Sequence, residues 1–273
     1  MRFIKLGSKY FAKNCWWLLL IWLVPSVFIG LLAGPFQIVE FINKYPSTVI
    51  SSFADIFKIL MPLSWQRVVF ALIGVVLVSV FLSMSVGQTE SHMRSGKLNF
   101  KEIFSYINND ILVVVINVIV IEIVYLLLTF ILGSVLFLFH LLLSGLSSVP
   151  SVLTVIIAII LCCGILLLYG FVLAMFLINI PNMITNGYSF KEGVSSTAQL
   201  MGRNSFGLIV AYLLPYLIAI PLVSLLCKTN ALWVANVLCF WLGSTYYSSL
   251  TMTAYFELSD TNRYDNRKYY NYK

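Results

Sequence analysis

The pattern of hydrophobic and polar positions divides this chain into six long apolar segments with shorter, more polar connections between them. Every segment is about 20 residues long or longer, and a helix of that length crosses about 30 Å of hydrocarbon at a rise of about 1.5 Å per residue. Only helices satisfy the backbone of such continuous apolar segments inside a bilayer. The predicted membrane spans are residues 15–34, 68–87, 111–135, 152–178, 206–227 and 231–256.

The composition supports the same prediction and sets the fold class. Hydrophobic residues make up 60% of the chain, charged residues only 10%, and the mean hydropathy is +0.96, which excludes an ordinary water-soluble domain. We predict an all-α fold in which six transmembrane helices form one polytopic membrane bundle over residues 1–273. The first span has too long an apolar core for a signal peptide and no small-x-small cleavage site follows it, so we expect it to be retained.

The basic residues between the spans gather on alternate connections. Thirteen of the 17 Lys and Arg fall on the set that contains both termini, and the others are Lys44, Lys58, Arg67 and Lys228. Because cytoplasmic connections are enriched in Lys and Arg, the sequence predicts a multi-pass cell-membrane protein with both termini in the cytoplasm. Most of the net charge of +7 then faces the anionic inner leaflet. Lipid therefore explains the basic pI, and nucleic acid is not expected as a partner.

Short amphipathic segments are predicted on this cytoplasmic side. Lys5, Lys9 and Lys13 recur every four residues among apolar and aromatic positions, which is typical of a helix lying on the inner leaflet. Similar segments cover residues 99–109 and 189–203. Each is either a lipid-contacting linker or a coupling helix for a membrane-protein or ATPase partner. The residues assigned to this cytoplasmic interface are Lys5, Lys9, Lys13, Phe100, Lys101, Phe190, Lys191 and Arg203.

An internal repeat is suggested by the residues that precede the odd-numbered spans. Asn14, Asn109 and Asn204 each stand directly before such a span, at intervals of 95 residues. Pro25 and Pro215 follow the first and third of these at an offset of 11 residues. The hypothesis is three similar transmembrane hairpins, with proline kinks in spans one and five that open a central cleft. The alternative is coincidence, since Asn caps helices readily and membrane helices tolerate Pro.

Two of the predicted cytoplasmic connections carry motifs that resemble a known family. The first holds Met93-Arg94-Ser95-Gly96 and Phe100-Lys101-Glu102-Ile103-Phe104, and the second holds Phe190-Lys191-Glu192, Ser195-Ser196 and Leu200-Met201-Gly202-Arg203-Asn204. They resemble an uncharacterised family of six-helix bacterial integral membrane proteins, similar to the membrane domain of some glycerophosphoryl diester phosphodiesterases. Arg203 stands where the family pattern usually has glycine. The resemblance implies a bacterial inner-membrane protein, and it brings no catalytic residues because the phosphodiesterase chemistry belongs to a soluble domain that we do not expect here.

Glu122 is placed near the centre of the third span, and Asn117 and Tyr125 lie close to it on the predicted helix. A carboxylate at that depth is costly. One hypothesis is that Glu122 couples the movement of protons or cations. The other is a neutral carboxyl group that hydrogen-bonds Asn236 or Tyr212 of another span and holds the bundle together. The candidate intramembrane polar site consists of Glu122, Asn117, Asn236 and Tyr212.

The remaining residues indicate no reaction. The sequence has no G-x-x-x-x-G-K-[ST] phosphate loop, no H-E-x-x-H and no G-x-S-x-G, and His92 and His140 are predicted on opposite sides of the membrane. Residues 179–182 are interpreted as the end of the fourth helix. We expect no catalytic residue, metal or cofactor. The predicted function is a non-catalytic scaffold or accessory factor that binds lipid or membrane partners; the alternative is a transporter or an ABC-type transporter permease subunit with ion or ATPase coupling.

Overall fold

The computed structural model describes residues 2–32, 36–45, 52–61, 65–144 and 151–264, and these residues form nine α-helices and no β-strand. Two 3-10 turns, η2 (Phe100–Glu102) and η3 (Gly202–Asn204), lead into α5 and α8. The predicted all-α fold is therefore confirmed. The helices are α1 (Arg2–Leu32), α2 (Gln37–Lys44), α3 (Phe53–Leu60), α4 (Trp65–Ser95), α5 (Ile103–Ser144), α6 (Ser151–Asn186), α7 (Phe190–Met201), α8 (Ser205–Leu226) and α9 (Leu232–Leu258).

The predicted spans coincide with the six longest helices. In the described part of the chain, five helices are long and apolar enough to cross a membrane, namely α1, α4, α5, α6 and α8. The sixth predicted span coincides with α9, which is rich in Ser, Thr and Tyr and falls outside this set. The chain is thus a helical bundle that fits a membrane protein, while the sixth crossing and the three repeated hairpins stay predictions.

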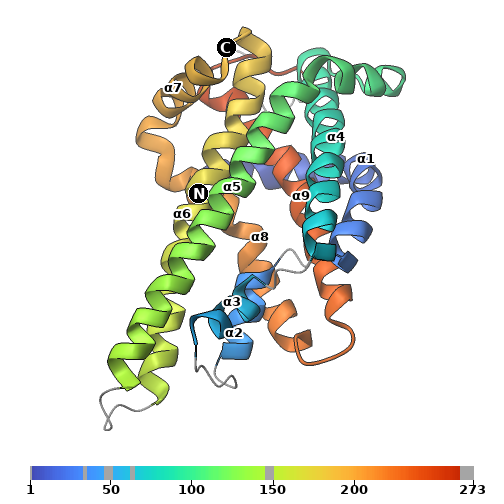
Figure 1. Ribbon diagram of the computed structural model, residues 1–273. Coiled ribbons are helices and arrows are strands. Elements are labelled where there is room, and N and C mark those ends of the chain that lie inside the picture. Colours follow the sequence, from blue (N-terminus) through green and yellow to red (C-terminus); the bar gives the residue numbers. More distant parts are fainter. Residues whose placement is uncertain (1, 33–35, 46–51, 62–64, 145–150, 265–273) are drawn as a thin grey trace.

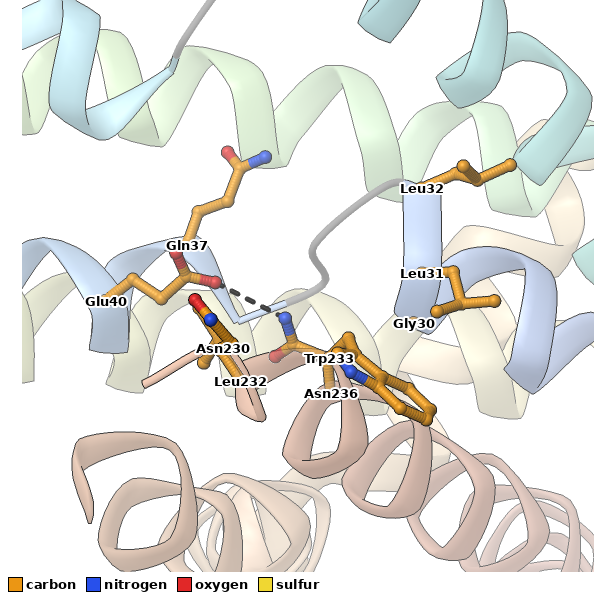
Figure 2. A pocket seen from close by; sticks show the side chains of 9 residues that line it. All are labelled: Gly30, Leu31, Leu32, Gln37, Glu40, Asn230, Leu232, Trp233 and Asn236. Atoms are coloured by element: carbon orange, nitrogen blue, oxygen red, sulfur yellow. Dashed lines mark hydrogen bonds between the residues drawn. The ribbon is translucent and has the colours of Figure 1, made fainter. Parts of the chain in front are cut away.

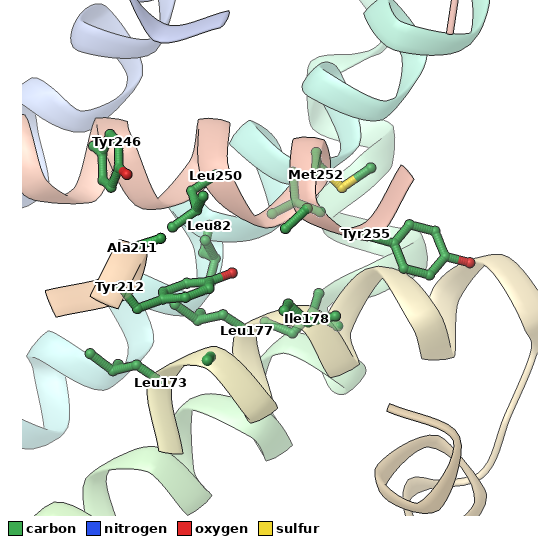
Figure 3. Packing of buried hydrophobic residues seen from close by; sticks show 14 of the residues in the cluster. Leu82, Leu173, Leu177, Ile178, Ala211, Tyr212, Tyr246, Leu250, Met252 and Tyr255 are labelled. Carbon is green, nitrogen blue, oxygen red and sulfur yellow. The ribbon is translucent and has the colours of Figure 1, made fainter. Parts of the chain in front are cut away.

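The helix α9 lies at the centre of the bundle, and its polar side chains face other helices. Almost every residue in the range 243–256 is buried, and α1, α4, α6 and α8 all pack against this helix. Figure 3 shows Leu250 packed among side chains of α4, α6 and α8. The Ser248 hydroxyl accepts a hydrogen bond from Trp22 Nε1 at 2.9 Å and lies 2.9 Å from Ser85 Oγ. Such internal hydrogen bonds allow a polar helix to occupy the core.

Pro25 and Pro215 lie inside the continuous helices α1 and α8, and both are buried. A Cβ atom added to Gly243 of α9 would lie 3.3 Å from Pro215 Cβ, so this proline packs directly against the central helix. At Pro215, packed side chains therefore occupy the region where the repeat hypothesis places a central cleft. The kinks themselves stay predictions.

The bundle has two distinct ends. Figure 1 shows α7 and the last turns of α9 at one end, which we call the α7 end. The short helices α2 and α3 and the turn between α8 and α9 lie at the other, which we call the α2 end. A capping box begins α7, because the Glu192 carboxylate accepts from both the backbone N–H and the hydroxyl of Ser189. Which of the two ends faces the cytoplasm stays a prediction.

The predicted amphipathic segments take two forms. The range 189–203 contains α7 as a separate helix, whereas α1 runs without a break from Arg2, so the N-terminal segment is not a helix of its own. It is nevertheless amphipathic, since Phe3 and Tyr10 are buried. The exposed members of the predicted cytoplasmic interface are Lys5, Lys9, Lys13, Phe100, Lys101, Lys191 and Arg203, and Phe190 is half-buried. Their role as an interface stays a prediction.

Candidate functional site

Glu122 lies halfway along α5, at the edge of the stripe of exposed apolar residues on this helix, and is itself exposed. Tyr125 of α5, Tyr169 of α6 and Tyr216 of α8 all interact electrostatically with its carboxyl group. The tyrosine rings form a ladder, with centroids 5.0 Å apart between Tyr125 and Tyr169 and 5.9 Å apart between Tyr169 and Tyr216. One carboxyl group and three phenol groups thus gather at the middle of the bundle.

The other three residues of the candidate intramembrane site have partners elsewhere. Asn117 Oδ1 accepts from Asn179 at 2.9 Å, the Tyr212 hydroxyl lies 3.1 Å from Thr251 Oγ1, and Asn236 donates to Glu40 Oε1 at 3.4 Å. Among the described residues, Glu122 forms no hydrogen bond with Asn236 or Tyr212. The four predicted residues are therefore not brought together, because the contacts of Asn117 lie toward the α7 end and those of Asn236 at the α2 end.

A buried hydrogen-bond network of three amide side chains and one threonine hydroxyl links α7 to α5 and α6. Thr197 of α7 donates to Asn179 Oδ1 at 3.1 Å and accepts from Asn182 Nδ2 at 3.0 Å. Asn179 in turn donates to Asn117 of α5, and all four side chains are buried. Gly193 makes this close packing of α7 feasible, since a Cβ atom there would lie 2.7 Å from Asn179 Oδ1. The network holds a helix at the α7 end in a fixed position.

The prediction that residues 179–182 end the fourth helix is wrong. The helix α6 continues through Pro181 to Asn186, because neighbouring groups in a helical bundle can satisfy the backbone that a proline frees. The spacing of Asn179, Asn182 and Asn186 places their side chains on one helix face. This spacing is the signal in the sequence that points to a polar contact rather than to a terminator.

A hollow of about 250 Å³ opens at the α2 end, between the last turn of α1, the helix α2 and the start of α9. One wall is apolar and comes from α1, while polar groups come from α2 and the turn before α9. Figure 2 shows Glu40 and Asn236 facing each other, with the Trp233 indole to one side. The lining residues are Gly30, Leu31, Leu32, Gln37, Glu40, Asn230, Leu232, Trp233 and Asn236.

Glu40 is the charged group that lines the hollow. Its Oε2 accepts a hydrogen bond from Lys44 Nζ at 3.0 Å, and its Oε1 accepts one from Asn236 Nδ2 at 3.4 Å. The Glu40 side chain is 15% exposed and Asn236 is 4% exposed. Because Asn236 Nδ2 donates to Glu40, its Oδ1 is fixed as an acceptor, and this atom has no hydrogen-bond partner within the described residues. The site is therefore suited to a cationic hydrogen-bond donor.

The sequence of α2 explains how Glu40 is held at the hollow. Gln37, Glu40 and Lys44 recur at intervals of three and four residues and so share one helix face. No motif in the sequence marks Glu40, and this polar spacing is the signal that points to it. The helix is anchored in the bundle by its buried apolar residues Ile38, Val39 and Phe41.

In the part of the chain that the structure describes, no three His, Cys, Asp or Glu side chains form a group that could hold a metal ion. Comparisons of the chain with protein-family models, curated proteins and solved structures found no match. The resemblance to the six-helix bacterial family therefore stays a prediction. Conclusions about function rest on the geometry of the chain itself.

Proposed function

We propose that this chain is a non-catalytic bacterial membrane protein of six spans that acts as a scaffold or accessory factor and binds lipid at the hollow of the α2 end. The observation that carries the proposal is the position of the hollow at an apolar surface. Leu31, Leu32 and Trp233 line it and are also exposed large hydrophobic residues. An apolar surface of this kind beside a polar hollow is suited to a lipid whose headgroup enters the hollow.

The packing of the core supports a binding role over a passage through the bundle. The central helix α9 is buried along residues 243–256 and is hydrogen-bonded to α1, α4 and α8 through the side chains of Trp22, Ser85 and Tyr212. A transport route at this position would require these contacts to open. A static bundle with a ligand site at one end requires no such rearrangement.

Affinity purification in a mild detergent, followed by native mass spectrometry, tests the proposal. We expect about one lipid molecule to stay bound to each protein monomer through purification, because a headgroup held in a hollow exchanges more slowly than annular lipid. Purified protein that carries no lipid, together with transport activity after reconstitution, would contradict the proposal.

Transport is the second candidate function, because Glu122 lies beside three tyrosines at the middle of the bundle. The two functions predict different effects of Glu122→Gln. For a lipid-binding scaffold, the variant should retain lipid to within about twofold of the original chain, since Glu122 is not among the residues that line the hollow. For a proton- or cation-coupled transporter, loss of the titrating group should lower flux into proteoliposomes by about tenfold or more. The same preparation of each protein serves for both measurements.

The orientation of the protein is tested by labelling cysteines placed at its two ends. In a variant whose five native cysteines are replaced by alanine, Lys191→Cys of α7 should react with a membrane-impermeant maleimide only after the cells are opened. Lys58→Cys of α3 should react in intact cells. Both side chains are exposed, so burial does not block the reagent at either position. The reverse labelling pattern would place α7 and both termini outside.

A further inference from the structure

We propose that the hollow at the α2 end binds the ammonium group of a zwitterionic phospholipid of the ethanolamine type. This inference rests on the proposed lipid-binding function and names the class of headgroup that the site recognises. Its basis is the combination of a carboxylate, an indole ring and carboxamide groups around one space of about 250 Å³. That volume suits a headgroup, while the acyl chains remain outside it.

The hollow supplies the partners that an ammonium group requires. A primary ammonium group has three N–H donors and no acceptor. The Glu40 carboxylate accepts charge-assisted hydrogen bonds, and Asn230 and Gln37 are also among the residues that line the hollow. The Trp233 indole is also part of the lining, and a ring face attracts a cation through its quadrupole. An anionic headgroup without an amine would instead meet the Glu40 carboxylate with like charge.

The amide of Asn236 holds Glu40 in place. Its Nδ2 donates to Glu40 Oε1, and Asn236 is almost completely buried between the hollow and the core. Its Oδ1 is a buried acceptor with no hydrogen-bond partner in the described residues. A buried acceptor without a partner is costly, so a donor that reaches this corner of the site gains free energy. The site therefore has unsatisfied acceptor capacity as well as negative charge.

The ion pair beside the hollow matches a zwitterion. Lys44 Nζ lies 3.0 Å from Glu40 Oε2, and the Lys44 side chain is 48% exposed. Lys44 does not line the hollow itself, but it lies on the same face of α2, so in the proposed complex its ammonium group would contact the lipid phosphate while Glu40 receives the headgroup amine. The adjoining Leu31 and Leu32 are exposed apolar residues along which acyl chains can lie. A single zwitterionic lipid would thus pair with both Lys44 and Glu40 and cover the apolar side chains of Leu31 and Leu32.

The test compares headgroups that share the same acyl chains. The full-length protein is reconstituted in nanodiscs of equimolar phosphatidylethanolamine and phosphatidylglycerol, re-extracted in mild detergent and analysed by native mass spectrometry. We expect the retained lipid to favour phosphatidylethanolamine by about tenfold, and Glu40→Gln to abolish that preference. Trp233→Leu should weaken the preference by about threefold, because it keeps an apolar wall but removes the ring.

Glu90→Gln is the matched control. Glu90 pairs with Arg94 at 2.8 Å in the same i,i+4 arrangement, and its side chain is 17% exposed, but it belongs to α4. This variant should keep the full headgroup preference. An equal loss in both variants would overturn the proposal, because the effect would then follow from removal of any partly buried ion pair. If Glu40→Gln does not fold, the proposal is tested by two other measurements. These are the headgroup preference of the original chain and its reduction in Trp233→Leu.

Two further outcomes separate the proposal from its premise. Lipid that is retained without any preference between the two headgroups overturns the ammonium site and leaves the lipid-binding function standing. Protein that retains no lipid overturns both. Free ethanolamine at millimolar concentration is added as a competitor, and we expect less than a twofold loss of bound lipid. Binding of ethanolamine in place of the lipid would assign the hollow to a soluble amine and overturn the lipid source.

Discussion

Replacement of Gly30 by alanine should lower the free energy of unfolding by about 3 kcal/mol, which is at the upper end of the range for overpacking. Gly30 of α1 lies against α9, and an added Cβ atom would be 2.6 Å from both the N and the Cα of Val237. These neighbours are backbone atoms, so a side-chain rotation cannot relieve the contact. The two helices would have to move apart along the most extensive helix pair in the bundle.

Gly164→Ala is the control for this prediction. Gly164 lies in α6, where a Cβ atom would meet nothing within 4 Å, so the same substitution should stabilise the protein by up to about 1 kcal/mol through helix propensity. Unfolding of both variants in mixed detergent micelles, followed by circular dichroism, measures the difference. Similar stability of the two variants would show that α1 and α9 do not approach each other as closely as the structure places them.

The positions of the membrane spans were predictable because a long apolar segment has few structural solutions. A run of about 20 apolar residues must be a helix when the surroundings offer no water to its backbone. The same argument does not establish which helix becomes central. The polar residues of α9 reduce its apolar character. Its burial is explained only by its hydrogen-bond partners on three other helices, which are Trp22, Ser85 and Tyr212.

The candidate sites were less predictable, because they depend on which helices meet. Asn236 was identifiable as a polar residue in a span, but its partner Glu40 belongs to a short helix in a connection, 196 positions away. Glu122 was identifiable as a carboxyl group at membrane depth. Its tyrosine neighbours come from α6 and α8 as well as from its own helix, and no spacing in the sequence brings Tyr169 and Tyr216 together.

Replacement of Asn179 by alanine should release α7 from the bundle. The change removes the donor to Asn117 Oδ1 and the acceptor of the Thr197 hydroxyl hydrogen, and both side chains stay buried. A hydrogen bond between membrane helices contributes only about 0.6 kcal/mol on average, but a buried polar group left without a partner costs about 1–3 kcal/mol. The cost of the unpartnered buried groups is the larger effect, so we expect the free energy that holds α7 to the bundle to fall by about 2 kcal/mol. Backbone amides of α7 should therefore exchange with deuterium about 30-fold faster.

Asn186→Ala distinguishes this release from a general loss of hydrogen bonds. Asn186 lies on the same helix and also donates to the carbonyl oxygen of Asn182, but it is exposed, so water replaces the bond that alanine removes. Its variant should change the exchange of α7 by less than about threefold, consistent with the small effects of exposed substitutions. Equal exchange in the two variants would mean that α7 is held by its apolar contacts with α6 rather than by the amide network. If the network holds α7, the helix moves only when a partner supplies the free energy of those buried hydrogen bonds. Such resistance to displacement suits a fixed docking surface and does not suit a coupling helix, which must move freely.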